Sequence, residues 1–248
     1  MNDDSNRPVA AVERALTILD AFRSGDSELS LAELSSRTGL YKSTLDRLAI
    51  TLERFGYLEK CSSGGYQLGA TPLKLATLYR GGVQPAEAIM AIMRKLVDET
   101  GESATFSVRR GSLRICIYRV DSPHRLRDQL SVGDPLPFDR GAGGRVFRTF
   151  GTDAEPGARA RLGKKLVVTA TDEVVEGIAG IAAPVFDENG ELHGALAISG
   201  PKFRLTREAM RRAEAPLLNA AYTLTHKLGG DLSAFEALTG RAASQAAP

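Results

Sequence analysis

The sequence predicts an α+β protein made of two domains, and three observations predict it. The first seventy residues carry apolar stripes of helical period, followed by two short strand runs joined by a small-residue loop. The chain beyond residue 100 mixes strand runs with long helical stripes. Within it, Asn189-Gly190 separates two apolar runs and favours a tight hairpin turn. Hairpin-linked strands with helices packed on them form an antiparallel sheet flanked by helices.

Length and composition describe an ordinary soluble globular protein. The chain has 248 residues, of which 43% are hydrophobic and 25% charged. No run approaches the roughly 20 apolar residues that a membrane span requires. Asp3 and Asp4 stand where a secretion signal would be basic and then apolar. We therefore expect a cytoplasmic protein without a membrane segment.

Cysteine and histidine are too few and too scattered for metal or hydrolase chemistry. Cys61 and Cys116 lie far apart in sequence, which offers neither a disulfide framework nor a metal-ligand spacing. The three histidines, His124, His193 and His226, are outside helical reach of one another. We expect no catalytic residues, no metal site and no cofactor, so the protein is not predicted to be an enzyme.

Two helices open the chain. The first follows Asn6-Arg7-Pro8 and ends at Ser24-Gly25, with an apolar stripe at positions 12, 16, 19 and 22. The second begins at Ser30, because Ser30-Leu31-Ala32-Glu33 has the form of a capping box, whose hydroxyl and carboxylate bind free amide groups. Gly39 supplies the left-handed residue that ends this short helix.

A third helix and a hairpin follow the turn at Thr38-Gly39-Leu40. The helix runs from Tyr41 to Phe55, with apolar residues at 45, 48, 52 and 55. Two helices joined by a short glycine-containing turn are typical of the helix-turn-helix, whose second helix lies in the major groove of DNA. Strands at 57–60 and 66–68, joined by Ser62-Ser63-Gly64-Gly65, form the wing.

The charge of this segment decides how it could bind DNA. Residues 1–70 hold 8 Lys and Arg against 10 Asp and Glu, so binding depends on where the cations lie rather than on a basic domain. Lys42, Ser43 and Thr44 lie in the first turn of the third helix, where amides and hydroxyls bind phosphate oxygens. Arg47, one turn further on, is the candidate for a base-edge contact.

Two alternatives stay open for this segment. Asp46 either accepts a hydrogen bond from cytosine N4 or repels phosphate. The polar face could also be a solvated surface that binds a protein partner, which makes a small-molecule sensor with a protein-binding N-terminal unit the alternative function.

The rest of the chain predicts a connecting helix, a second domain and a tail. Thr71-Pro72 starts a helix that reaches about Tyr79, and residues 71–84 link a first domain at 1–70 to a second at 85–229. The second domain has helices at 86–100 and 206–228 and strands at 103–109, 113–119, near 129–132, 180–186 and 192–199. Pro216 should kink or divide the last helix. Residues 230–248, rich in Ala and Ser, predict a flexible tail.

Small residues cluster at Gly141-Ala142-Gly143-Gly144-Arg145. They would let a ligand approach backbone amides at a helix start, where an anion is favoured. The run lacks the Lys-Ser/Thr pair of a P-loop and the spacing of a Rossmann fingerprint. It is therefore either the border of a ligand pocket or a close-packed turn.

These motifs together resemble the IclR family. Val12-Glu13-Arg14-Ala15-Leu16, the capping-box segment 30–34, Tyr41-Lys42-Ser43-Thr44 and the segment 52–58 follow the order and spacing of its DNA-binding domain. Thr100-Gly101-Glu102-Ser103, the segment 177–187 and Ser199-Gly200-Pro201 resemble its effector domain. The resemblance covers about residues 8–229.

The resemblance implies a transcriptional regulator, repressor or activator, with a winged helix-turn-helix and a GAF-like effector domain. It would bind operator DNA as a homodimer or dimer of dimers and respond to a small-molecule effector. The predicted DNA-binding residues are Arg14, Tyr41, Lys42, Ser43, Thr44, Asp46, Arg47 and Gly64. Matching family positions give the predicted effector-binding residues as Leu136, Ala142, Gly143, Ile178, Gly180, Ala197 and Ser199.

Arginines suggest the class of effector. Six of them crowd the middle of the chain: Arg109, Arg110, Arg114, Arg119, Arg125 and Arg127. Because an arginine fork matches a carboxylate in geometry and charge, an aromatic or aliphatic acid is expected, although any one arginine could be a solvated strand-edge charge. The segment 150–177 is shorter than in many relatives, which predicts missing pocket-flanking helices and a more open site.

Overall fold

The computed structural model describes residues 8–23, 25–81, 86–152, 154, 156–158, 160 and 165–239. The chain divides into two compact units, Met1–Gln84 and Pro85–Pro248. No helix in the described part of the chain is long and apolar enough to cross a membrane.

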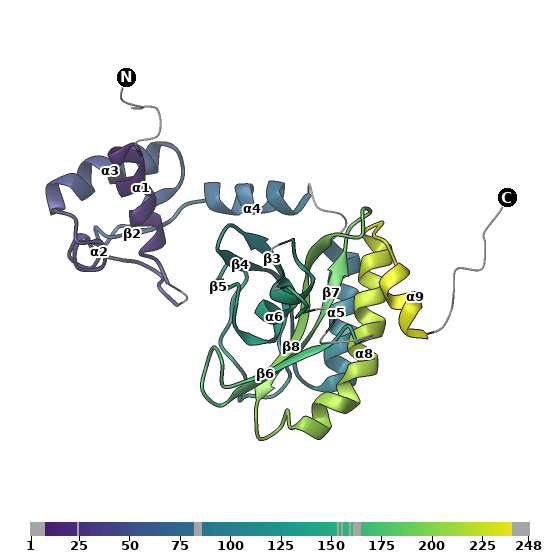
Figure 1. Ribbon diagram of the computed structural model, residues 1–248. Coiled ribbons are helices and arrows are strands. Elements are labelled where there is room, and N and C mark those ends of the chain that lie inside the picture. The colour runs from purple at the N-terminus through teal and green to yellow at the C-terminus, as the bar shows by residue number, and fades with distance from the viewer. Residues whose placement is uncertain are drawn as a thin grey trace. The chain divides into compact units, whose positions relative to one another are not determined.

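The first unit is a winged helix-turn-helix, as the sequence predicts (Figure 1). Its elements in chain order are α1 (Ala10–Asp20), α2 (Leu31–Thr38), α3 (Lys42–Arg54), β1 (Leu58–Lys60), β2 (Tyr66–Leu68) and α4 (Thr71–Gly81). The two strands pair antiparallel, with Glu59 opposite Gln67. The core of the unit is Ile18, Ala21, Leu29, Leu34, Leu45, Ala49, Leu52, Leu58 and Tyr66.

Local signals set the ends of these helices. Ser30 and Glu33 form the predicted capping box: the Ser30 amide donates to the Glu33 carboxylate at 2.9 Å, and the Glu33 amide donates to Ser30 Oγ at 3.3 Å. Gly39 ends α2 with a φ of 71°, a left-handed conformation that suits glycine. The helix-turn-helix geometry thus follows from a few residues.

The predicted stripe on α1 is wrong at two positions. Val12 and Leu16 are 55% and 54% exposed, whereas Ile18 is fully buried. Leu19 and Phe22 pack partly against the core, so the inward face of α1 is turned toward Ile18. The periodicity identified a helix but not which apolar side chains it buries.

The second unit is a six-stranded antiparallel sheet flanked by helices, which confirms the α+β prediction. Its strands are β3 (Ser103–Arg110), β4 (Leu113–Val120), β5 (Pro135–Pro137), β6 (Val168–Thr171), β7 (Ile178–Phe186) and β8 (Leu192–Pro201), in the order β5-β4-β3-β8-β7-β6. Its helices include α5 (Ala86–Thr100), α6 (Gly141–Phe150), α8 (Arg207–Lys227) and α9 (Ser233–Thr239).

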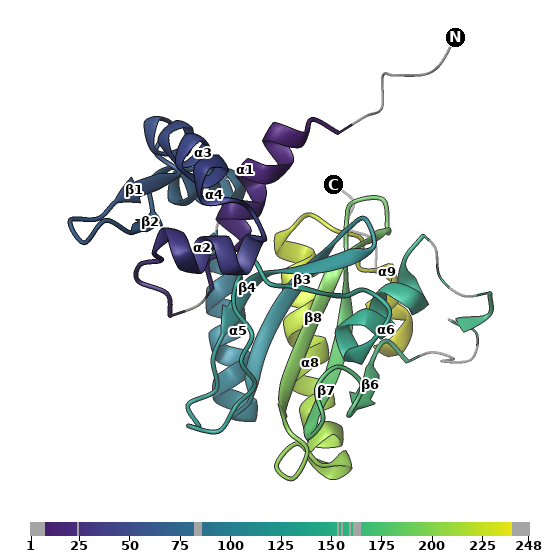
Figure 2. The ribbon, with the colours of Figure 1, turned by 90° about the vertical axis from the view of Figure 1, so that its left-hand side faces the viewer.

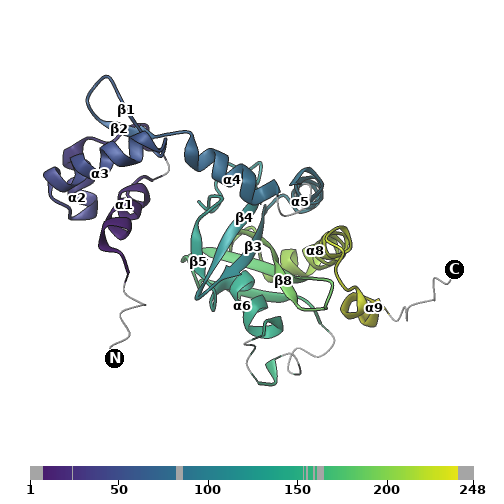
Figure 3. The same ribbon diagram turned by 90° about the horizontal axis from the view of Figure 1, so that it is seen from above.

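The helices cover both faces of the sheet. Helices α5 and α8 lie side by side on one face, and α6 lies on the other (Figures 2 and 3). Apolar side chains such as Phe106, Ile181 and Leu196 fill the space between sheet and helices. Helix α8 passes through Pro216 as one helix, so the predicted division does not occur, and its buried face continues on both sides of the proline.

Three strand and tail predictions need correction. No strand forms at 129–132, because Ser131 to Asp134 make a turn in which the Ser131 amide donates to Asp134 at 2.7 Å. The edge strand β5 forms instead at Pro135–Pro137, where prolines are tolerated because an outer edge needs no amide donors. Strand β6 was not predicted.

The third correction concerns the tail. The expected flexible segment from residue 230 contains helix α9, in which Phe235 is 4% exposed. Its ring packs edge-on against Phe186 and Tyr222, both with centroids 5.9 Å away. The Asp231 side chain accepts from the Ser233 amide at 3.0 Å and caps the helix. Residues 240–248 of the predicted tail lie outside the described residues.

Candidate functional site

Helix α3 presents most of its predicted DNA-binding residues to solvent. Tyr41, at the N-cap, is 83% exposed, and Lys42, Ser43, Asp46 and Arg47 are also exposed. Thr44 is half-buried. This face is free because the opposite one buries Leu45, Ala49 and Leu52 against the rest of the unit. No side chain caps the start of α3, so the amides of Lys42 and Ser43 can meet an anion, whereas the Thr44 amide already donates to the Tyr41 carbonyl at 2.9 Å.

The other two predicted DNA-binding residues lie on other elements of the same unit. Arg14 is exposed on α1, and Gly64 is exposed in the turn of the wing with a φ of 93°. Glu28 fastens that turn: its carboxylate accepts from the Ser63 hydroxyl and, at 3.1 Å, from the Gly65 amide. The wing is thereby tied to the body of its own unit.

Sequence reasoning missed Arg37, which joins two helices. The guanidinium donates to the Asp26 carboxylate and, at 2.9 Å, to the carbonyl of Ala21 at the end of α1. The hydrogen bond from Arg37 lowers the pKa of Asp26 below its usual value. Arg37 thus positions α2, which α3 follows after one turn, and the Arg-Asp spacing in sequence carries no signal for it.

All seven predicted effector-binding residues line a single cavity in the second unit. Its volume is about 390 Å³, within the roughly 300–1,000 Å³ of small-molecule sites. Most of its wall is apolar, from β7, β8 and the loop that joins β6 to β7. Two of the six arginines that the sequence singled out, Arg114 and Arg127, also line it. The structure adds lining residues that the sequence did not single out, among them Thr105, Asp128, Leu130, Glu173, Val174 and Val175.

Arg114 is the buried cation of this cavity. Its residue is 6% exposed, and burial lowers the pKa of its guanidinium to about 10, which leaves it charged at neutral pH. Its Nε donates to the carbonyl of Pro137 at 3.1 Å. Among the described residues, no carboxylate forms an ion pair with Arg114. Arg119 and Arg127, by contrast, pair with Asp121 or Asp128.

A β-bulge decides which side of β4 carries these arginines. Phe106 of β3 pairs with Tyr118, but Ser107 pairs with Cys116, so Ile117 is the extra residue. A bulge shifts the in-out alternation by one position. Arg114 and Arg119, five residues apart, therefore share the face that carries the cavity.

The glycine run at the start of α6 packs against Arg114. A Cβ placed on Gly143 would lie 3.0 Å from the Arg114 guanidinium, and Gly141 has a φ of 74°. The run therefore borders the cavity and is also a close-packed turn. The Gly141 amide donates to the Glu173 carboxylate at 2.9 Å, so this chain's own acid already occupies one amide at the helix start.

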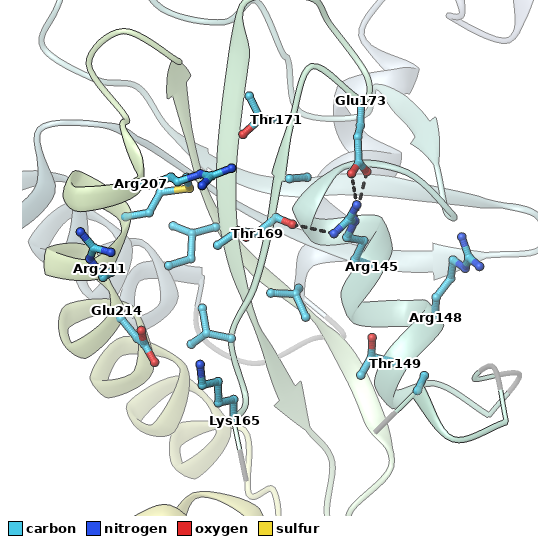
Figure 4. A pocket seen from close by; sticks show the side chains of 16 residues that line it. Arg145, Arg148, Thr149, Lys165, Thr169, Thr171, Glu173, Arg207, Arg211 and Glu214 are labelled. Atoms are coloured by element: carbon cyan, nitrogen blue, oxygen red, sulfur yellow. Dashed lines mark hydrogen bonds and ion pairs between the residues drawn. The ribbon is translucent and has the colours of Figure 1, made fainter. Parts of the chain in front are cut away.

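A larger hollow of about 920 Å³ lies around the edge strand β6 and contains none of the seven predicted residues. Figure 4 shows Arg145 facing Glu173 on one side of the strand, with Arg207 and Arg211 of α8 on the other. Arg145 also donates to the Thr169 carbonyl at 3.0 Å. Charged side chains dominate this wall, and Glu173 lines both cavities.

The described residues hold no cluster suited to metal chemistry, since no three of their His, Cys, Asp and Glu side chains converge. Burial raises the pKa of the Cys116 thiol to about 11, so it stays protonated and unreactive at neutral pH. Of the expected segment with missing helices, residues 153, 155, 159 and 161–164 lie outside the described part, so that prediction is not tested.

An exposed recognition-type helix followed by a two-stranded wing defines the class of helix-turn-helix DNA-binding regulators. The family models support this. The IclR helix-turn-helix domain matches residues 11–61, and the bacterial transcriptional regulator IclR C-terminal domain matches residues 82–165 and 164–226. The chain belongs to the IclR family and is a DNA-binding transcriptional regulator rather than an enzyme.

Individual relatives agree along nearly the whole chain. The glycerol operon regulatory protein of Streptomyces coelicolor is 28% identical, covering 90% of this chain and 98% of its own. The transcriptional repressor IclR of Escherichia coli is 25% identical, covering 90% and 91%. An IclR homologue from Microbacterium hydrocarbonoxydans, solved with 4-hydroxybenzoate, has a TM-score of 0.71 at 17% identity, covering 88% and 99%. The alternative of a protein-binding N-terminal unit finds no support in these matches.

Proposed function

We propose that an organic acid binds the cavity beside α6 and controls operator binding by this regulator. The observation that carries the proposal is Arg114, a buried cation with no acidic partner among the described residues. An unpaired buried charge is costly, and a carboxylate is the ligand that best offsets it. The α6 start adds the positive end of the helix dipole on the same wall, where Glu173 already accepts from the Gly141 amide.

The rest of the wall favours an acid with an apolar body. Leu130, Leu136, Val174, Val175 and Ile178 line the cavity, which suits a single ring or a short aliphatic chain. The related structure that holds 4-hydroxybenzoate is in keeping with this class, although its sequence identity is only 17%.

Thermal-shift screening tests the effector class. Aromatic and aliphatic acids are compared with their amides, which have the same shape without the charge. A ligand that binds only the folded state raises the melting temperature, so we expect acids to raise it and amides to leave it unchanged. The Arg114→Met variant should lose the response. Stabilisation by amides alone would refute an acid effector.

For DNA, we propose that Lys42, Ser43 and Thr44 bind phosphates and that Arg47 reads a base edge, with Tyr41, Asp46, Arg14 and Gly64 at the same interface. Exposure of most of this set on α1, α3 and the wing supports the proposal. Residues 71–84 would connect the two domains, and the protein would act in the cytoplasm, where the operator lies.

We also propose that the protein is a homodimer. Apolar side chains stand exposed on two helices of the first unit: Val12 and Leu16 on α1, and Leu73, Leu75 and Leu78 on α4. Neighbouring exposed apolar residues on one helix commonly mark an interface. A two-fold dimer would also match a palindromic operator.

A further inference from the structure

We propose that the effector carries a hydrogen-bond donor, a hydroxyl or an amine, remote from its carboxylate, and that Asp128 and Ser199 select it. The inference rests on the proposed acid effector and specifies its other end. Asp128 and Ser199 both line the cavity. They lie on the wall formed by β8 and the loop after β4, whereas Arg114 lies against the start of α6.

Asp128 is held in a fixed orientation. Ser199 Oγ donates to its Oδ2 at 2.8 Å, and Arg119 donates to its Oδ1 at 2.9 Å. The side chain is only 14% exposed. A carboxylate oxygen can accept two hydrogen bonds, so each oxygen keeps one acceptor position after these contacts. Because Asp128 lines the cavity, a ligand donor is the partner that this position suits.

Charge gives the cavity a direction. Arg114 brings a guanidinium without an acidic partner among the described residues, whereas Asp128, although paired with Arg119, offers only acceptor oxygens to a ligand that contacts it. Arg127 and Glu173 also line the cavity, and Glu173 binds the Gly141 amide. A ligand carboxylate is attracted to Arg114 and repelled by Asp128. A ligand with a carboxylate at one end and a donor at the other can bind Arg114 and Asp128 together. A second carboxylate in place of the donor would be repelled by Asp128.

Asp128 and Ser199 also fasten the loop after β4 to β8, so a purely structural role must be separated from selection. Affinities for matched ligands separate the two roles. If Asp128 and Ser199 only anchor the loop, replacing Asp128 should change the affinity for every ligand by the same factor. Two series keep the acid end constant and change the other end from methyl to hydroxyl to carboxylate: 4-methylbenzoate, 4-hydroxybenzoate and terephthalate; hexanoate, 6-hydroxyhexanoate and adipate.

The test is isothermal titration of the full-length protein with both series. In at least one series we expect the hydroxyl compound to bind at least tenfold more tightly than the methyl compound, and the dicarboxylate to bind most weakly. Asp128→Asn should reduce the preference for hydroxyl over carboxylate at least tenfold by removing the repulsion. Asp98→Asn, which removes the same charge from the exposed side of α5 and outside the cavity, should leave the preference unchanged.

The outcomes separate this inference from the proposed function. Acids that bind through Arg114 with the methyl compound equal to or better than the hydroxyl compound overturn the inference and leave the acid effector intact. Failure of every acid to bind overturns both. If Asp128→Asn does not fold, the order of the three ligands in the wild-type protein decides alone.

Discussion

Arg114 shows how a residue that lowers stability can serve binding. Burial lowers the pKa of its guanidinium from the usual value to about 10, which corresponds to roughly 3 kcal/mol of unfavourable burial. Because the pKa is lowered and not raised, the cost is fully present below pH 10, where both folded and unfolded chains are protonated, and is relieved only at higher pH. The protein carries this cost throughout the physiological range.

Arg114→Met should therefore stabilise the unliganded protein while removing acid binding. Methionine fills similar volume without a charge, and loss of the hydrogen bond to Pro137 offsets part of the gain, so we expect about 1–2 kcal/mol. Urea unfolding with and without an acid ligand measures both effects. A destabilised variant that still binds acids would contradict the role assigned to Arg114.

Arg47 should matter for DNA affinity and for base preference. Arg47→Ala is expected to weaken operator binding by about 1–3 kcal/mol and to relax selectivity at one position. Fluorescence anisotropy with operator variants measures this. Arg54→Ala is the matched control, because Arg54 lies at the other end of α3, over the ring of Phe55, and should change affinity much less. Equal effects of the two variants would refute a specific contact by Arg47.

Short-range signals predicted most elements, and long-range packing accounts for the errors. Ser30, Glu33 and Gly39 determine α2 through contacts within one turn, so the sequence alone located it. Phe235 gives no such signal, because its partners Phe186 and Tyr222 are distant in sequence, and α9 was missed. The bulge at Ile117 likewise hides which β4 arginines share the face of the sheet that carries the cavity. The seven cavity residues came from family resemblance rather than from any local pattern.

Helix α9 should be part of the folded domain. Phe235→Ala is expected to lower the free energy of unfolding by about 3 kcal/mol, since it removes the ring contacts with Phe186 and Tyr222 and leaves a cavity. Chemical denaturation measures the loss. Phe203→Ala is the matched control, because Phe203 is 68% exposed and its removal should change stability much less. If Phe235→Ala behaves like Phe203→Ala, α9 does not contribute to the core.

The proposed homodimer requires an apolar interface between two copies of the chain. Leu75 and Leu78 lie one turn apart on α4 and are exposed. Replacing both by Glu should convert a dimer of twice the 26.5 kDa chain mass into monomers, because charged side chains are excluded from an apolar interface. Light scattering coupled to gel filtration gives the mass, with Thr77→Glu as the control on the same helix. A monomeric wild-type protein would contradict the proposed homodimer.

The central claim is that this protein binds DNA through α3 and that an acid in the Arg114 cavity changes that binding. Titration of the full chain with its own upstream DNA, at several salt concentrations and with or without a stabilising acid, tests it most directly. We predict an affinity that falls steeply with salt, as phosphate contacts release counterions, and that shifts with the acid in the wild type but not in Arg114→Met. A DNA affinity that changes neither with salt concentration nor with added acid would contradict the claim.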